Sequence, residues 1–324
     1  MAEELKLLEK WSLKVHEVKL GAGPSAGGTR GVTFNIGGQS SLPFLFKEGQ
    51  IPNKPLIAAE VLDCVEDDWP ESLQIDLASV SRDPVEWARK MVSDPGGADL
   101  VCLKLQGAHP DFGNKPAKDS RVLVEAVLKK IKTPLIILGC GSADKDNEVL
   151  PAISEATKGE RLLFGDVVPE NYKTLAAACI ADGHNIIAES PIDVNIAKQL
   201  NILLSDLGMP LDRIVINPTI GALGYGLEYA YSIMERAKSA ALSGDKMLAM
   251  PFVCFVGQEA WRAKEAKVSL KDFPQGGNAR TRGIMWEVVT AMAMLEAGAD
   301  ILTMRHPEAI KIVKKAITDL MTSL

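Results

Sequence analysis

The feature that most constrains this chain's fold is an alternation of short, continuously apolar runs with amphipathic helical patterns. Residues 184–228 show it most clearly: the run His184–Ala188 precedes a helical pattern that ends at Gly208, a typical C-cap glycine, and the run Arg213–Ile216 follows. A helix between two such strands makes a right-handed crossover with parallel strands. Sites in these units lie where strands give way to loops, so Asn217–Gly226 is the first place to look for a site.

The same pattern continues from residue 55 to the end of the chain. We identify eight runs typical of strands buried on both faces: Leu56–Ala59, Leu100–Leu105, Leu135–Leu138, Arg161–Phe164, Asn185–Ala188, Arg213–Ile216, Phe252–Val256 and Asp300–Met304. Helical patterns include Arg121–Ile131, Asn171–Ile180, Tyr229–Leu242 and Pro307–Leu324. Eight alternating units predict an α/β fold, a closed (β/α)8 TIM barrel over residues 55–324. A doubly wound open sheet is the alternative, but the first strand is followed by neither GxGxxG nor a P-loop.

Residues 1–54 have a different pattern. The acidic, amphipathic segment Met1–Trp11 comes first, and a short helix is predicted there. Lys14–Leu20 and Arg30–Ile36 then alternate apolar and polar positions around a glycine-rich turn, which predicts an antiparallel β-hairpin. We expect this extension either to plug the far end of the barrel or to hold a partner subunit.

Composition narrows the function classes. The net charge is −6 and no basic run carries interleaved aromatic residues, so nucleic acid is not an expected partner. No apolar stretch resembles a signal peptide or approaches the roughly 20 residues of a membrane helix, so a cytoplasmic protein is expected. The five cysteines are scattered without a C-x-x-C pair, so neither an iron–sulfur cluster nor a zinc site is expected on this chain.

In a barrel, the residues at the carboxyl ends of the strands line one mouth. The candidates are Glu60, Asp63, Lys104, Gln106, Gly139–Gly141, Gly165, Asp166, Glu189, Ser190, Asn217, Gly221, Gly257, Glu259, Arg305 and His306. We find no paired carboxylates and no Ser-His-Asp arrangement among them, and we assign no catalytic residue. A mouth short of acid–base groups suits binding better than catalysis.

Six residues are predicted to bind a cofactor at this mouth: Asn217, Gly221, Gly224, Gly257, Arg305 and His306. Asn217 offers an amide, and the glycines of the following loop allow a large flat ligand to approach the backbone. A tight strand-to-helix turn explains the same glycines equally well. His306 is the one histidine well placed for a site, although such a residue more often satisfies local backbone groups.

Lys104 alternates with apolar neighbours and is predicted to point into the barrel. A desolvated lysine can form a Schiff base, which would suit an aldolase. An ion pair with Glu60 or Asp63 is the favoured interpretation, because no acid–base partners for a Schiff-base mechanism are evident.

Long ordered stretches, among them KPLIAAEV, the segment from Asn185 to Lys238, GDKMLAMPFVCFVGQEAWRAKEA and GIMWEVVTAMAMLEAGADILTMRHPEA, carry a resemblance. Over nearly its whole length, including GGTR at Gly27–Arg30, the chain closely resembles the small (delta) subunit of the corrinoid iron–sulfur protein of the acetyl-CoA synthase/CO dehydrogenase system.

The resemblance implies a barrel subunit that forms a heterodimer with a large subunit. That subunit would carry the 4Fe–4S cluster and the cobamide-binding domain, with the corrinoid held between this domain and the barrel described here. It also implies two further partners in the anaerobic acetyl-CoA pathway. A methyltetrahydrofolate:corrinoid methyltransferase would supply the methyl group, and acetyl-CoA synthase/CO dehydrogenase would receive it.

The predicted barrel is also similar to those of pterin-dependent methyltransferases, in which an asparagine near the end of a late strand contacts the pterin. Asn217 has a comparable setting. An autonomous pterin-dependent corrinoid methyltransferase is therefore the alternative function.

Overall fold

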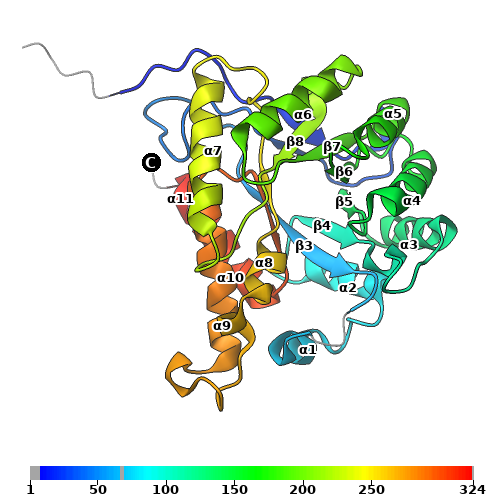
Figure 1. The fold of residues 1–324 in the computed structure, drawn as a ribbon, viewed down its shortest axis with the longest axis vertical. Helices are drawn as coiled ribbons and strands as arrows, with labels where there is room; N and C mark the ends of the chain where they lie inside the picture. Colours follow the sequence, from blue (N-terminus) through cyan, green and yellow to red (C-terminus); the bar gives the residue numbers. More distant parts are fainter. Residues whose placement is uncertain (1–7, 66–68, 323–324) are drawn as a thin grey trace, which may run out of the picture.

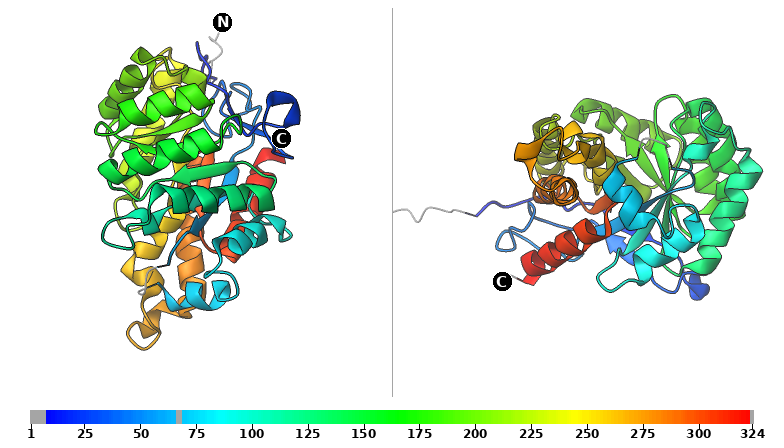
Figure 2. Two further views of the ribbon diagram at one scale, coloured as in Figure 1. Left: turned by 90° about the vertical axis from the view of Figure 1, so that its right-hand side faces the viewer. Right: turned by 90° about the horizontal axis from the view of Figure 1, so that it is seen from below.

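The computed structural model describes residues 8–65 and 69–322. Its centre is a parallel sheet of eight strands in the order β8-β7-β6-β5-β4-β3-β10-β9. A bridge between Ile216 and Phe252 joins the two ends of this sheet, so it closes into a barrel. The helices form a ring around the strands, as the view from below shows (Figures 1 and 2). The predicted TIM barrel is confirmed.

The barrel strands are β3 (Leu56–Leu62), β4 (Leu100–Lys104), β5 (Leu135–Leu138), β6 (Leu163–Val167), β7 (Asn185–Glu189), β8 (Ile214–Asn217), β9 (Val253–Cys254) and β10 (Ile301–Met304). The helices are α1 (Glu71–Leu77), α2 (Pro84–Ser93), α3 (Ala117–Lys130), α4 (Ala143–Ala156), α5 (Tyr172–Asp182), α6 (Val194–Asp206), α7 (Leu227–Leu242), α8 (Val256–Arg262), α9 (Lys264–Lys267), α10 (Ala279–Glu296) and α11 (Pro307–Thr322).

The strands form because their side chains are apolar on both faces. One set packs outward against the helices, and the other fills the barrel interior, where Leu56, Leu100 and Ile136 share one cluster. A filled interior leaves no channel through the barrel. Ligand chemistry is therefore confined to the ends of the strands.

The predicted hairpin closes the end of the barrel opposite the mouth. β1 (Val18–Leu20) pairs antiparallel with β2 (Phe34–Ile36), and their buried side chains join the interior cluster. The Asn185 side chain at the start of β7 donates a hydrogen bond to the Lys19 carbonyl at 2.9 Å. Of the two expected roles, the structure shows the plug; it does not test a contact with a partner subunit.

Arg30 explains the GGTR sequence of the extension. Its buried guanidinium pairs with Glu160 at 2.9 Å and donates to the carbonyl groups of Leu128 and Ile131 at the end of α3. It thereby supplies donors to helix carbonyls that have no partner within the helix. Arg30 fastens the extension to the barrel.

Several predicted boundaries are wrong. The run Phe252–Val256 forms only the short β9, because the chain turns into α8 at Val256. β6 continues to Val167, three residues beyond Phe164, where the predicted strand ends. The predicted N-terminal helix falls largely on residues 1–7, outside the described residues, and residues 8–11 are not helical. Among the described helices, none is long and apolar enough to cross a membrane.

Candidate functional site

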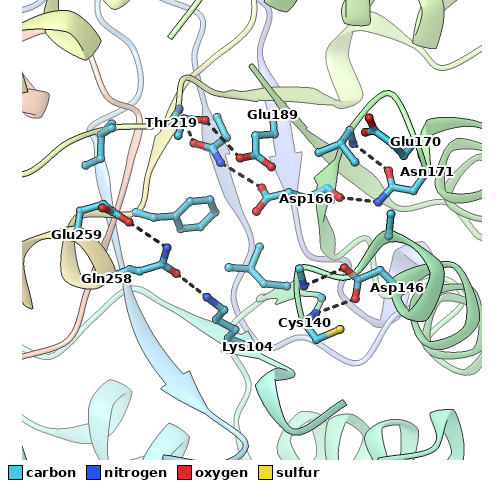
Figure 3. Close-up of a pocket in the computed structure, with 18 of the residues that line it drawn as sticks. Lys104, Cys140, Asp146, Asp166, Glu170, Asn171, Glu189, Thr219, Gln258 and Glu259 are labelled. Carbon is cyan, nitrogen blue, oxygen red and sulfur yellow. Dashed lines mark hydrogen bonds between the residues drawn. The ribbon is translucent and has the colours of Figure 1, made fainter. Parts of the chain in front are cut away.

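The mouth of the barrel contains a cavity of about 480 Å³. Most of its polar lining comes from strand ends and the loops after them, and α4 contributes Asp146 (Figure 3). Its polar side chains include Lys104, Cys140, Asp146, Asp166, Glu170, Asn171, Glu189, Asn217, Thr219, Gln258, Glu259 and Arg262. The cavity lies where chemistry was expected, at the carboxyl ends of parallel strands.

Two carboxyl groups, Asp166 and Glu189, lie on neighbouring strands of this cavity. The Asn217 amide donates to Asp166 Oδ1 at 3.3 Å, and the Thr219 hydroxyl donates to Glu189 Oε1 at 3.4 Å. Burial, together with the neighbouring charge of Glu189, raises the pKa of Asp166 to about 8. Burial also raises the pKa of Glu189. The pair therefore retains a proton near neutral pH.

Asn217 is held in one orientation. Its Oδ1 accepts the Thr219 backbone N–H at 3.0 Å, which leaves its NH2 group for Asp166. Thr219 has φ of 54°, a left-handed conformation that non-glycine residues rarely adopt. Such strain is typical of functional turns.

Lys104 points into the cavity, as predicted, but it does not pair with the residues expected. Its Nζ donates to Gln258 Oε1 at 2.5 Å. The ion pair predicted with Glu60 or Asp63 is not formed, because Glu60 pairs with Arg305 and Asp63 with Lys115. Lys104 instead ties β4 to α8 across the mouth.

A third carboxylate, Asp146 on α4, fastens the loop after β5. It accepts the backbone N–H groups of Cys140 at 2.7 Å and Gly141 at 3.1 Å. A Cβ on Gly139 would lie 2.3 Å from this carboxylate, which explains the glycine. Burial raises the pKa of the Cys140 thiol to about 11, so it is not a ready nucleophile.

Of the six predicted cofactor-binding residues, only Asn217 lines the cavity. Gly221 and Gly224 lie in the loop after β8. A Cβ on Gly221 would approach the Tyr225 carbonyl oxygen to 2.2 Å, whereas Gly224, at φ of 78°, has open space around it. Gly257 lies inside α8, where a Cβ would be 2.7 Å from the backbone nitrogen of Arg305. The lack of a side chain at Gly257 therefore lets α8 pack closely against the end of β10.

Arg305 and His306 follow β10 but lie outside this cavity lining. Arg305 donates twice to the buried Glu60, at 2.7 and 3.0 Å. His306 donates to or accepts from Asp76 of α1 at 2.8 Å, and its ring stacks on Trp261. These contacts hold α1 and α8 to the barrel.

The expectation that the mouth is short of acid–base groups and lacks paired carboxylates is wrong. Asp166 and Glu189 form such a pair, and Asp146 and Glu259 lie in the same cavity. Their positions at strand ends were the available signal. What the sequence does not show is that these positions, on different strands, converge.

Exposed apolar side chains lie on several connections at the mouth end of the barrel. Five of the eight connections that follow barrel strands carry one large apolar or aromatic residue that is 42% to 65% exposed. They are Ile75, Phe112, Ile192, Tyr225 and Leu270, here called the rim residues. At the opposite end, the described connections that lead from helices into strands carry only Leu207 at comparable exposure, and the extension that closes this end carries Val32 and Leu45. Because most connections at this end carry one, this end of the barrel is a candidate surface for a partner.

A family model and individual relatives point to the same protein family. The family model for the CO dehydrogenase/acetyl-CoA synthase delta subunit matches residues 17–320. The acetyl-CoA decarbonylase/synthase complex subunit delta of Archaeoglobus fulgidus is 35% identical over 317 residues, covering 96% of this chain and 70% of that protein. The corresponding subunit of Methanopyrus kandleri is 34% identical over 304 residues, covering 94% and 74%.

Solved structures of dihydropteroate synthase share the fold. The Thermus thermophilus enzyme in complex with 6HMPPP aligns with a TM-score of 0.55 and 15% identity, over 86% of this chain and 100% of that one. The Xanthomonas albilineans enzyme with 4-aminobenzoic acid aligns with a TM-score of 0.57 and 12% identity, over 86% and 98%. At these identities the likeness extends to the barrel alone.

Proposed function

Because the chain belongs to the CO dehydrogenase/acetyl-CoA synthase delta subunit family, as its sequence resemblance indicated, we propose that it is the small subunit of a corrinoid iron–sulfur methyl carrier. With a large subunit it encloses a cobamide in the cytoplasm. The cobamide accepts a methyl group from methyltetrahydrofolate through a separate methyltransferase and delivers it to acetyl-CoA synthase.

The observation that carries this proposal is the set of rim residues on the connections that follow the strands, at the end of the barrel that holds a polar cavity. An isolated enzyme gains little from five exposed apolar side chains on separate loops, whereas a subunit that closes over a partner buries them. Ile192 supports this interpretation, because it is both exposed and held at φ of 46°. A β-branched residue in that conformation is strained, and strain of this kind is often retained for function.

A cobamide would lie over this mouth and would not enter its cavity. A cavity of about 480 Å³ accommodates a small ligand, whereas a corrin macrocycle with its side chains is much larger. The rim residues would contact the edge of the macrocycle or the domain that holds it. Asp166, which keeps its proton near neutral pH, offers an O–H donor to amide oxygens such as those on the corrin periphery.

The iron–sulfur cluster is proposed for the large subunit. A 4Fe–4S cluster is held by four thiolates, but in the described chain no three or more His, Cys, Asp or Glu residues are grouped to hold a metal. The cobamide would supply the methyl-transfer chemistry on its cobalt. The residues of this chain would orient it and exclude water.

Co-purification tests the proposal directly. The chain is expressed together with the large subunit, and the complex is isolated without oxygen. We expect a heterodimer with the visible absorption of a bound corrinoid. Isolation of the two chains separately, each at full size and folded, contradicts the proposal.

A second candidate, an autonomous pterin-dependent corrinoid methyltransferase, is favoured by one observation. The Asn217 amide and the proton-retaining Asp166 lie together in a cavity of small-ligand size, and an amide beside a carboxyl can pair with the edge of a pterin ring. One of the fold neighbours is described in complex with the pterin 6HMPPP.

Turnover separates the two candidates. The isolated chain is mixed with methyltetrahydrofolate and free cob(I)alamin, and methylcobalamin formation is followed by absorbance. Saturable turnover that Asn217→Ala abolishes supports the enzyme. No turnover, together with heterodimer formation, supports the carrier subunit.

A further inference from the structure

The outer face of α10 differs from that of an ordinary barrel helix. A surface helix normally presents polar residues to water. α10 buries Ile284, Val288 and Ala291, but its outward side carries Met285 and Val289, which are 43% and 41% exposed and one turn apart. A helix that is apolar on both sides indicates burial against something further.

A groove of about 420 Å³ lies along this face. It is lined by Leu223, Asn278, Thr281, Met285, Trp286 and Val289, which we call the α10 groove. The Trp286 indole N–H donates to the Leu223 carbonyl at 3.1 Å, and the Thr290 hydroxyl accepts the Leu223 N–H at 3.2 Å. These bonds fix the ring and the loop, so the groove is preformed.

Hydrogen bonds connect the groove to the mouth: Arg282, which lines the groove, donates to the Glu265 carbonyl at 2.6 Å. Arg262 lines the mouth cavity, and two residues later the Lys264 N–H donates to the hydroxyl of the rim residue Tyr225 at 3.2 Å. The same hydroxyl donates to Glu265 at 2.8 Å. The segment from α9 to the start of α10 projects beyond the barrel in Figure 1, so a partner that covers the mouth also meets this segment.

Charge indicates what kind of partner fits. From Arg262 to Arg282 the chain has six basic and two acidic residues, a net charge of +4, although the whole chain carries −6. Arg280 is neutralised by Asp76 and Glu308. Lys267 and Lys271 are exposed, and the described part of the chain offers neither an ion pair. A complementary surface therefore carries carboxylates around an apolar centre.

We propose that the α10 groove, with its basic border, docks an apolar, carboxylate-bordered surface of the large subunit. This rests on the proposed function, because it assigns the groove to the same partner that covers the mouth. The large subunit then contacts the chain in two adjacent regions, the rim and the α10 groove.

The test is the affinity of the chain for the corrinoid-loaded large subunit. Val289→Glu is expected to weaken binding at least about tenfold, because it places a charge at the centre of an apolar contact. Val122→Glu on α3 is the matched control: Val122 is 58% exposed, and α3 lies on a different side of the barrel from α10 (Figure 1). It is expected to bind like the unaltered chain. Lys267→Glu with Lys271→Glu is expected to weaken binding and reduce its dependence on salt.

Other outcomes overturn the inference in distinguishable ways. If Val289→Glu binds normally while Phe112→Asp at the rim binds weakly, the large subunit covers the mouth without α10, and the proposed function stands. If the unaltered chain does not bind the large subunit, both proposals fail. If Val289→Glu instead abolishes self-association or binding to anionic vesicles, the occupant of the groove is a second copy or a membrane, and the inference is wrong.

Discussion

Replacing Asp166 with asparagine should stabilise the protein, the reverse of the usual effect of changing a buried polar residue. Burial and the charge of Glu189 raise the pKa of Asp166 to about 8, from an ordinary value of 3.8. Each pKa unit corresponds to about 1.36 kcal/mol, so holding this group in the folded state at pH 7 costs at most about 4 kcal/mol. Glu189 shares the titration, and we expect Asp166→Asn to raise the free energy of unfolding by about 2–4 kcal/mol.

The pH dependence identifies the cause. The folded carboxyl keeps its proton to a higher pH than the unfolded one, so this group makes the protein less stable as pH rises from about 4 to about 8. Asparagine still accepts the Asn217 amide but cannot ionise, so the variant loses this slope. Urea unfolding at pH 5, 7 and 8 measures the difference, with the exposed Asp111→Asn as control. A variant less stable than the unaltered protein, or an equal difference at every pH, refutes the reasoning.

Three further predictions concern other parts of the chain. Arg30→Met should lower the free energy of unfolding by about 3–5 kcal/mol in urea titrations, because it leaves buried Glu160 unpaired, and adding Glu160→Gln should restore part of the loss. Burial lowers the pKa of His184 to about 4, so its contribution to stability should fall by about 2 kcal/mol between pH 7 and pH 5, and the loss should be absent in His184→Gln. Ile192→Asn should relieve strain at positive φ and stabilise the loop by up to about 1 kcal/mol, yet weaken binding to the large subunit; weaker binding accompanied by a lower melting temperature would contradict this.

The barrel could be predicted because its strands are continuous apolar runs. Leu135–Leu138 is buried at every position, and a run of that kind has few alternatives once helical patterns flank it. The apolar pattern was less informative at β9. Phe252–Val256 has the apolar pattern of a strand, but the chain enters α8 at Val256.

The cavity could be predicted only in part. Asp166 and Glu189 were placed at strand ends, but the strand that carries Asp166 was predicted to end at Phe164, where its apolar run stops. Gly165 is instead inside the strand, where a Cβ would lie 2.8 Å from Ile187 of β7. The alignment of Glu189 with Asn217 also depends on the register between β7 and β8. Register between distant segments is not encoded in any one of them.

Partners formed across long sequence separations were the other limit. Arg305 and His306 follow β10 as predicted, yet their contacts are Glu60 and Asp76, more than two hundred residues earlier. A strand-end position therefore identifies candidates for a mouth. It does not show which of them face the cavity and which hold the surrounding helices.

Hydrogen–deuterium exchange of the chain with and without the corrinoid-loaded large subunit tests most directly whether a partner covers the mouth. The account predicts slower exchange in the loops that carry Phe112, Ile192 and Tyr225, and unchanged exchange at the opposite end of the barrel around Leu207. Protection confined to the hairpin and the loop at Leu207, with none at the mouth, would contradict it.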